Sequence, residues 1–264
     1  TNYPNYYLDG GLLNLVKPLI EFVERKGGEI VYREEVESIE QENGCYITRT
    51  SKSEYRSEYL ISGIPFNNTL EVFKGQIDGR LKAKELHSPQ LNSAFQMGVG
   101  FVPHRHFESI HHQIHLSEPL PETGSASIFI SLNHPEDKTR SDEPGHAVMS
   151  VSTHHPDPAN KIIDNRVVEN AVLDELIKRD FIKKENVKYY HSSTPKAWTK
   201  WTGRKWGFVG GYPQYMKIKP WQMLDSRLDG HKAYQVGDTV YPGQGIPGVT
   251  LSGIIAVNKM NTDW

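Results

Sequence analysis

The chain has 264 residues, and its 30 Lys and Arg against 32 Asp and Glu give a net charge of -2. This near balance gives no whole-chain reason to expect a nucleic-acid partner, and we predict none. With 37% hydrophobic and 10% aromatic residues, the composition is that of a folded protein. The single cysteine, Cys45, excludes an internal disulfide and a Cys-His zinc framework and fits a reducing, cytoplasmic compartment.

The first third of the chain predicts a helix followed by short strands. Apolar residues recur at helical spacing from Leu12 to Val23, and Gly27-Gly28 is typical of a helix end. Strands are predicted at 29–32, 35–41, 45–50 and 58–63, with a short helix at 68–73. Asn43-Gly44 is a strong hairpin signal between two of these strands. Thr1 is not Met and no signal sequence is visible, so we expect a fragment of a longer protein.

The middle of the chain changes to longer strands. Runs of strand type at 90–102, 125–132 and 147–153 predict an antiparallel sheet. A helix is predicted at 165–179 and a strand at 187–192. The C-terminal part has a strand at 234–236, a Gly- and Pro-rich turn at 237–248 and a helix at 249–260. These elements indicate an α/β protein with an added antiparallel sheet.

The C-terminal turn contains a glycine pattern. Residues 243–248, Gly-Gln-Gly-Ile-Pro-Gly, match G-x-G-x-x-G between a strand and a helix. The dinucleotide fingerprint needs a second strand and an acidic residue about 20 positions on, but only 16 residues follow Gly248. We therefore reject that interpretation. The turn still has two features suited to ligand binding. Its glycines allow close approach of a ligand, and the helix start offers free N–H groups. Asp238 would accept a hydrogen bond from a ligand hydroxyl. The alternative interpretation of the turn is a tight loop that only caps the helix.

Three segments carry a family resemblance. The ordered segments Tyr234–Thr239, Pro242–Val249 and Ser252-Gly253 are similar to the C-terminal flavin signature of the phytoene desaturase family. That family lies within the amine oxidase-like flavoproteins. Residues 10–39, with Gly10-Gly11-Leu12 and Gly27-Gly28, resemble its middle segment. A weaker third match comprises Thr194-Pro195, Trp206-Gly207 and Gly210-Gly211.

The resemblance implies a discontinuous, Rossmann-like FAD-binding domain. Its middle segment would be residues 1–72 and its C-terminal segment residues 221–264, with an antiparallel-sheet substrate-binding domain at 73–220. By the same resemblance, the Val36 backbone contacts adenine and Asp238, after Gly237, lies near the ribityl and pyrophosphate groups. The turn against the isoalloxazine ring comprises Gly245, Ile246, Pro247, Gly248 and Val249. A helix start there would stabilise negative charge on the reduced flavin.

The implied activity is that of an FAD-dependent oxidoreductase of the carotenoid desaturase type. Its substrate would be a long apolar polyene or isoprenoid that transfers hydride to the flavin, with Phe101, Val102, Phe129 and Ile130 as candidate tunnel residues or plain core. No catalytic residue is assigned. The family's strand–turn–helix pyrophosphate fingerprint is absent from this sequence, so we expect the chain to be roughly a second half, inactive alone.

Three alternatives stay open. The first is an FAD-dependent amine oxidase, in which Trp206 and Tyr212 would supply an aromatic pair facing the flavin. The second is a non-enzymatic relative that binds prenyl groups or lipids in the same fold. The third is an isolated binding module.

Two other clusters invite functional interpretations. Five of the twelve histidines lie within residues 104–115, but H-E-x-x-H is missing and a strand would place His111 and His112 on opposite faces, so we predict no metal. Trp and Lys alternate along residues 196–206. This run is typical of nucleic-acid stacking, of a membrane-interface belt or of an aromatic cluster. The apolar substrate favours a peripheral membrane contact of a cytoplasmic protein.

Overall fold

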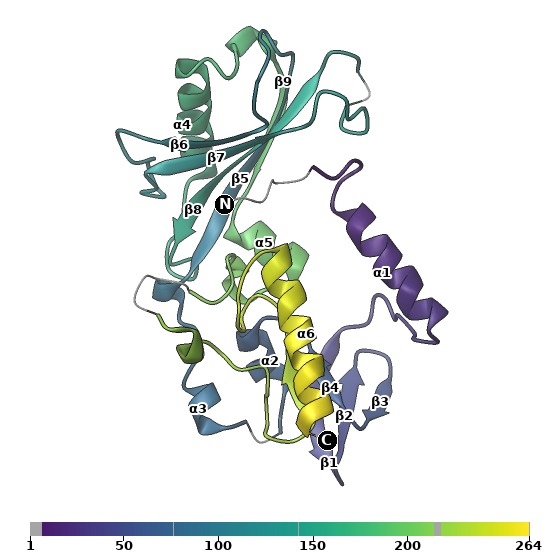
Figure 1. Cartoon of the computed structure of the whole chain (residues 1–264). Helices are drawn as coiled ribbons and strands as arrows, with labels where there is room; N and C mark the ends of the chain where they lie inside the picture. Colours follow the sequence, from purple (N-terminus) through teal and green to yellow (C-terminus); the bar gives the residue numbers. More distant parts are fainter. Residues whose placement is uncertain (1–6, 76, 142, 214–217, 264) are drawn as a thin grey trace. The chain divides into compact units, whose positions relative to one another are not determined.

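The computed structural model describes residues 7–75, 77–141, 143–213 and 218–263, and the chain divides into two compact units (Figure 1). Unit 1 comprises residues 1–32, 94–155 and 163–194, and unit 2 comprises residues 33–93, 156–162 and 195–264. Each unit is therefore built from three separate stretches of sequence. Compactness alone does not reveal which stretch holds a cofactor, so the functional segments 1–72, 73–220 and 221–264 stay a prediction.

Unit 1 is built on a five-stranded sheet of order β6-β7-β8-β5-β9. Its strands are β5 (Asn92–Phe101), β6 (His111–His115), β7 (Ser127–Leu132), β8 (Ala147–Pro156) and β9 (Val187–Ser193). The pairs β6–β7, β7–β8 and β5–β9 are antiparallel, and β7–β8 joins two of the three strands predicted to form an antiparallel sheet. Helix α4 (Asn165–Lys178) packs on the sheet through Val168, Val172 and Leu176, which join the apolar side chains of β5, β7 and β8 in one buried cluster.

Helix α1 (Leu13–Arg25) in unit 1 confirms the predicted N-terminal helix. The helix is strongly amphipathic, yet none of its residues is buried. Gly27, with φ +84°, ends it in the left-handed conformation that glycine adopts without strain. Ahead of the helix, the Tyr7 hydroxyl donates to Asp137 Oδ2 at 2.6 Å and ties the chain to the loop before β8.

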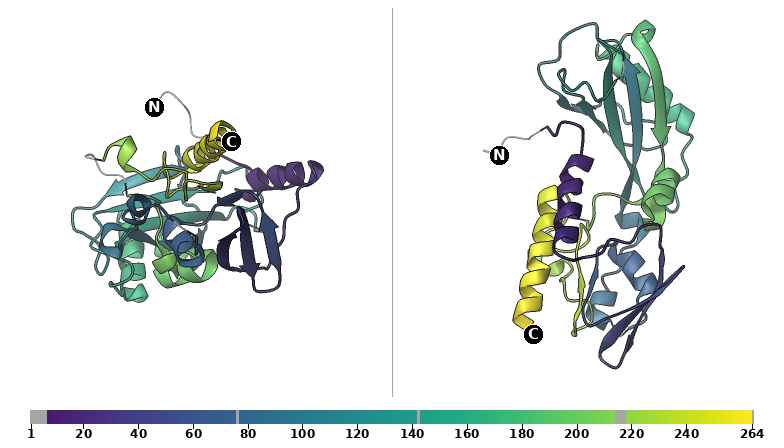
Figure 2. Two further views of the ribbon diagram at one scale, coloured as in Figure 1. Left: turned by 90° about the horizontal axis from the view of Figure 1, so that it is seen from below. Right: turned by 90° about the vertical axis from the view of Figure 1, so that its right-hand side faces the viewer.

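Unit 2 combines an antiparallel sheet with a parallel pair of strands (Figure 2). Strands β1 (Val36–Glu42), β2 (Cys45–Thr50) and β3 (Glu54–Ser57) form the antiparallel sheet. The predicted hairpin turn is confirmed, since Asn43 and Gly44 both have positive φ, at 50° and 77°. Strand β4 (Leu60–Ser62) pairs in parallel with β10 (Ala233–Gln235), which lies far along the chain.

Helices surround the strands of unit 2. They are α2 (Phe66–Val72), α3 (Gly79–Lys82), α5 (Pro195–Thr202) and α6 (Ile246–Asp263). Short 3-10 turns occupy Ser88–Gln90, Lys205–Gly207 and Pro220–Gln222, and a fourth, Lys184–Asn186, belongs to unit 1. The main core of unit 2 packs Ile39 and Tyr46 of the antiparallel sheet against Phe66 and Phe73 around α2 and Ala233 of β10.

Two strand predictions differ from the structure. The predicted strand 29–32 is wrong, because this stretch is irregular, leaves Val31 and Tyr32 exposed and pairs with no strand among the described residues. Strand β3 was not predicted, because its sequence Glu-Tyr-Arg-Ser is polar and only its pairing with β2 makes it a strand. Both outcomes depend on a partner strand, which local sequence does not encode.

Candidate functional site

The carboxyl ends of β4 and β10 lie side by side in unit 2. The parallel register pairs Leu60 with Ala233 and Ser62 with Gln235, so both strands end at the same edge. After β4 the chain turns through Gly63 into α2, and after β10 it turns through Gly237 towards α6. In open parallel sheets, ligands bind in the crevice beyond the carboxyl ends of the strands. The geometry therefore directs attention to these two turns.

Gly237 and Gly211 near these turns have backbone conformations that favour glycine. Gly237 has φ +107°, and a Cβ built on it would lie 3.5 Å from the Gly63 carbonyl oxygen. Gly211, with φ +66°, is more crowded, because its Cβ would lie 2.2 Å from the Asp238 carbonyl oxygen. That same oxygen accepts a bond from the Tyr212 N–H at 3.1 Å. The weak sequence match at Gly210-Gly211 thus lies directly against Gly237-Asp238.

Helix α6 begins at Ile246, three residues before the predicted start at Val249. Gly245, with φ +86°, turns the chain into the helix, and its carbonyl accepts the Val249 N–H at 2.9 Å. Gly248 packs on the turn, since a Cβ there would lie 2.4 Å from the Gly243 carbonyl oxygen. Ile246 and Val249 are exposed, so the positive end of the helix dipole is accessible to a ligand.

A buried serine connects the two parts of the predicted site. Ser252 of α6 is fully buried, and its hydroxyl accepts the Gly237 N–H at 2.9 Å and donates to the Val249 carbonyl at 2.7 Å. Gly237 and the start of α6 are thereby held together. Sequence reasoning missed this role of Ser252, although its place in the ordered C-terminal signature was the available signal.

Asp238 has a cationic partner that the sequence did not reveal. Arg204 Nη2 lies 3.0 Å from Asp238 Oδ2, and the guanidinium stacks over the Phe208 ring at 4.5 Å. About a fifth of each charged side chain is exposed. A ligand hydroxyl at Asp238 would therefore share the carboxylate with Arg204. In the sequence, only the position of Arg204 near Trp206-Gly207 pointed to a role for it in this site.

A buried polar network fixes the strand ends. The Thr69 hydroxyl donates to Gln235 Oε1 at 2.7 Å, and the Gln235 side-chain amide donates to the Ile64 carbonyl at 2.5 Å. The Phe66 N–H donates to the Thr239 hydroxyl at 3.0 Å. Since these groups come from β10, from α2 and from the chain after each strand, the network holds the two turns together.

Val36 lies at a different place from the C-terminal turn. It begins β1, is 37% exposed and lines a hollow of about 490 Å³ along β4. Gly63 and Ile64 line the same hollow, whereas none of residues 237–249 does. The Glu34 carboxylate at its rim accepts a hydrogen bond from the Thr50 hydroxyl, which lowers the pKa of Glu34 below its ordinary value.

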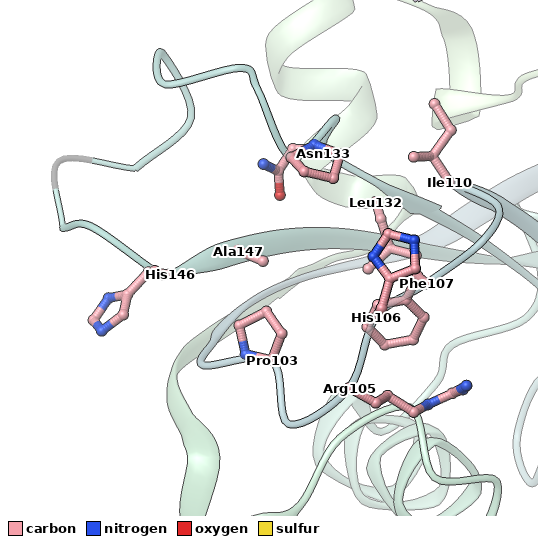
Figure 3. Close-up of a pocket in the computed structure, with 11 residues that line it drawn as sticks. Pro103, Arg105, His106, Phe107, Ile110, Leu132, Asn133, His146 and Ala147 are labelled. Carbon is pink, nitrogen blue, oxygen red and sulfur yellow. The ribbon is translucent and has the colours of Figure 1, made fainter.

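Unit 1 holds a smaller hollow at one end of its sheet (Figure 3). Its volume is about 270 Å³, and its lining includes Phe107, Ile110 and Leu132. His106 and His146 also line the hollow, and His146 is drawn apart from Phe107 and Leu132 (Figure 3). None of the four candidate tunnel residues lines this hollow. Phe101 and Ile130 are fully buried in the core cluster of unit 1. This position agrees with the alternative that they are core residues and not tunnel residues.

The histidine-rich strand is hydrogen-bonded. His111 pairs through Nδ1 with the Ser131 hydroxyl at 2.8 Å and stacks on Phe129, while His112 Nε2 lies 2.8 Å from the Ser109 carbonyl. The burial pattern of β6 places His111 and His112 on opposite faces, as predicted. Within the described residues no group of three His, Cys, Asp or Glu side chains has the arrangement of a metal site.

The aromatic and basic run divides into two environments. Trp206 adopts φ +56° and packs with Tyr212 around the buried Leu86, Leu91 and Phe208. Trp201 of α5 is 79% exposed, with Lys200 Nζ 5.2 Å from its ring centroid. In the described part of the chain, no helix combines the length and the apolar character needed to span a bilayer.

Comparison with known families decides the broader identity. The sequence matches the family described as flavin containing amine oxidoreductase over residues 2–261. The chain belongs to this family. This family consists of oxidoreductases, and its cofactor is FAD. No curated protein matches the chain.

Solved structures of this flavoprotein type share the fold. A putative protoporphyrinogen oxidase from Exiguobacterium sp. 255-15 has 19% identity and a TM-score of 0.62, and the match covers 97% of this chain and 51% of that one. An oxidoreductase from Methanosarcina mazei has 15% identity and a TM-score of 0.59, with coverages of 95% and 55%. Cyclohexylamine oxidase from Brevibacterium oxydans has 12% identity and a TM-score of 0.54, with coverages of 94% and 51%.

These neighbours confirm the fold class, a mixed α/β protein with antiparallel sheets of the amine oxidase-like FAD-binding type. The chain spans about half the length of the solved structures that it matches. Binding of FAD at the turn after β10 stays a prediction. The positive φ of Gly237 and the exposed residues at the start of α6 are compatible with a ligand at this turn.

Proposed function

We propose that this chain forms part of an FAD-dependent oxidoreductase of the carotenoid desaturase type. The observation that supports this most is the turn after β10, where Gly237, Asp238 and the start of α6 are held together by Ser252. Residues 234–253 also keep the order of the phytoene desaturase signature. Because the chain spans about half the length of its neighbours, the whole activity is a proposal.

Each residue of the proposed site has a distinct task. Gly237 lets the backbone approach the cofactor, Asp238 accepts a cofactor hydroxyl, and the N–H groups at the start of α6 stabilise negative charge on the ring. Val36 would contact the adenine through its backbone. When bound, FAD supplies the hydride acceptor, and the protein supplies orientation and a dry environment.

The proposed substrate is a long apolar polyene or isoprenoid. A peripheral membrane contact fits this proposal, because such substrates reside in lipid. The exposed Trp201 and Trp221, at 79% and 77% exposure, are the side chains that we propose for this contact. Loss of liposome flotation in a Trp201→Ala, Trp221→Ala variant would support it, whereas flotation unchanged from the unmodified protein would exclude this role.

The decisive experiment examines the complete gene product that carries this sequence. Its visible spectrum is recorded before and after denaturation, and released flavin is compared with protein concentration. The flavin-loaded protein is then mixed without oxygen with an apolar polyene or with a polar amine. Bleaching of the flavin band by the polyene alone supports the proposal. A colourless protein that takes up no added FAD would exclude an FAD enzyme and favour the lipid-binding alternative.

A second candidate function is oxidation of an amine. Cyclohexylamine oxidase and a putrescine oxidase are among the structural neighbours, and Trp206 and Tyr212 pack around the same buried cluster beside Asp238. If this candidate is right, the polar amine bleaches the flavin and the polyene does not. Replacing Tyr212 with Leu would then weaken amine turnover while flavin content stays constant.

A further inference from the structure

The hollow of unit 1 combines apolar walls with basic side chains (Figure 3). Four of its apolar lining residues belong to the buried cluster of this unit or pack against it: Phe107, Ile110, Leu132 and Ala147. Arg105, His106 and His146 line the same space, and no aspartate or glutamate is among its described lining residues. An apolar space with a few polar groups is typical of a site for a small molecule.

Three contacts fix the guanidinium group of Arg105. Its Nε donates to the Asp180 carbonyl at 2.9 Å. Its Cζ lies 4.6 Å from the centroid of the Phe107 ring and 5.6 Å from that of the Phe181 ring. A guanidinium group has five N–H donors, and the four on the two Nη atoms have no partner among the described residues. Arg105 therefore presents a fixed fork of donors that the protein itself does not use.

The Asp180 carboxylate pairs with Arg105 but leaves this fork free. Its Oδ2 lies 3.7 Å from Arg105 Nε, and its Oδ1 lies 2.8 Å from His104 Nε2. It thus offsets part of the positive charge without contacting either Nη atom. The imidazoles of His106 and His146 also have no hydrogen-bond partner in the described part of the chain. Each of them can donate at least one N–H to a ligand.

The loop between β7 and β8, residues 133–146, also contributes to the lining and is held in place by hydrogen bonds. The buried Asp137 carboxylate accepts the Tyr7 hydroxyl at 2.6 Å and the Thr139 N–H at 2.9 Å. Asn133 Oδ1 accepts the Val148 N–H at 2.7 Å. The hollow is therefore largely formed before a ligand enters, which reduces the entropy lost on binding.

The volume of the hollow limits the size of its ligand. About 270 Å³ is the volume that about nine water molecules occupy in the liquid. It lies just below the range of about 300–1,000 Å³ that is usual for ligand pockets. A single ring with one short acidic group is of this size, whereas the long polyene of the proposed function is too large.

We propose that the hollow of unit 1 binds a small aromatic carboxylate, whose ring covers the apolar walls and whose carboxylate pairs with the two Nη atoms of Arg105. The planar guanidinium fork matches a carboxylate through two parallel N–H···O bonds. Inorganic phosphate would also pair with Arg105 but would leave the apolar walls uncovered. This inference goes beyond the proposed function, because the described lining residues belong to unit 1 and the candidate flavin turn belongs to unit 2.

The first test is calorimetric titration of the complete gene product with benzoate at constant ionic strength. We expect saturable binding that Arg105→Gln weakens at least about tenfold, because the charged hydrogen bonds are lost. Arg166→Gln is the matched control, since Arg166 is exposed in the same unit and does not line the hollow. It should leave the affinity unchanged. No saturation below about 10 mM, or equal affinity in Arg105→Gln, would overturn the proposal.

Two other probes test the ligand chemistry on the unmodified protein, so their result does not depend on how a variant folds. Benzamide keeps the ring without the charge, and inorganic phosphate keeps the charge without the ring. Both should bind at least about tenfold more weakly than benzoate. Benzamide that binds as tightly as benzoate would exclude recognition of the carboxylate. Phosphate that binds as tightly would reduce the site to a simple contact between an anion and a surface arginine.

Photolabelling with 4-azidobenzoate locates the binding site in the unmodified protein. Peptide mapping should find the label within residues 103–110 or 132–147, which contain the described lining residues, and excess benzoate should prevent it. Labelling outside these segments would overturn the proposal. If benzoate also shifts the visible flavin spectrum in that case, its site is at the cofactor.

Discussion

At the scale of single residues, the candidate site depends on two small groups, Gly211 and the Ser252 hydroxyl, which touch neighbouring backbone atoms. The Gly211 Cα lies so close to the Asp238 carbonyl that any side chain would collide with it. The Ser252 hydroxyl accepts the backbone N–H of the half-buried Gly237. In both cases the neighbouring backbone atom determines which side chain is tolerated. The loss of stability caused by a substitution follows from that contact.

Gly211 offers a matched test with Gly230. Both have positive φ, +66° and +72°, but a Cβ on Gly230 would meet nothing within 4 Å. Alanine at either position costs about 1–2 kcal/mol because of backbone conformation. We expect Gly211→Ala to lower the free energy of unfolding by at least about 1 kcal/mol more, because of its collision with Asp238. Urea unfolding measures the difference, and equal losses would contradict close packing here.

Ser252→Ala is expected to destabilise unit 2 by about 1–3 kcal/mol, because it leaves the Gly237 N–H without its acceptor. Thr250→Ala is the control, since Thr250 lies exposed on the same helix. That change should stay within about 0.5 kcal/mol. Urea midpoints and FAD titration of both variants provide the measurement, and a neutral Ser252→Ala would refute the structural role of the hydroxyl.

Tyr46 predicts a loss of stability at alkaline pH. Its buried hydroxyl donates to Asp229 at 2.6 Å, and burial together with this bond raises the pKa of Tyr46 above its ordinary value. In the unfolded chain the tyrosine ionises near pH 10. The contribution is therefore complete below about pH 10 and decreases as pH rises further, because only the unfolded form then releases the proton.

The measurement is the urea midpoint from about pH 8 to 11. Tyr46→Phe should be less stable at neutral pH and should lose most of the decline above about pH 10. Tyr55→Phe, at an exposed tyrosine of β3, should keep the decline. A decline that persists in Tyr46→Phe would assign it to another group.

At the scale of elements, α6 has a crowded start and an open middle. Gly248 and Gly253 both lie in this helix with ordinary φ, but a Cβ on Gly248 would lie 2.4 Å from the Gly243 carbonyl, whereas Gly253 faces open space. The glycine turn and the helix are thus one packed unit at the N-terminal end only.

Alanine should therefore have opposite effects at these two glycines. Gly253→Ala should stabilise the protein by about 0.5–1 kcal/mol through helix propensity. Gly248→Ala should destabilise it and weaken FAD binding, because the helix start must shift away from Gly243. Thermal unfolding and FAD titration measure both effects, and stabilisation by Gly248→Ala would show that the turn is loosely packed.

At the scale of the whole molecule, the two units have separate cores. The buried cluster of unit 1 includes Leu176 and Val172, whereas the cluster around Tyr46 and Phe66 belongs to unit 2, and the clusters share no residue. Chains with distinct cores often depart from two-state unfolding.

Leu176→Ala tests this independence, since it removes a fully buried side chain from the core of unit 1. It should cost about 2–5 kcal/mol locally. Hydrogen exchange should then lose protection in β7 of unit 1 and keep it in β10 of unit 2. Equal loss of protection in both strands would reveal a single cooperative unit.

Local patterns in the sequence determined much of the secondary structure. The apolar spacing of residues 12–23 forms α1, and Asn43-Gly44 forms the hairpin turn, because each depends on residues close in the chain. The ordered signature at 234–253 also indicates the flavoprotein family, which the family match over residues 2–261 confirms. The roles of Val36, Asp238 and residues 245–249 in FAD binding remain predictions.

Contacts between distant residues were decided only by the tertiary structure. Strands β4 and β10 are separated by most of the chain, so their parallel pairing has no local signal. The same holds for Arg204 at Asp238 and for Gly211 at the Asp238 carbonyl. Local sequence determines which conformations a segment prefers. The free energies of burial and of strand pairing arise only when distant segments come into contact, and these contacts position the residues of the candidate site.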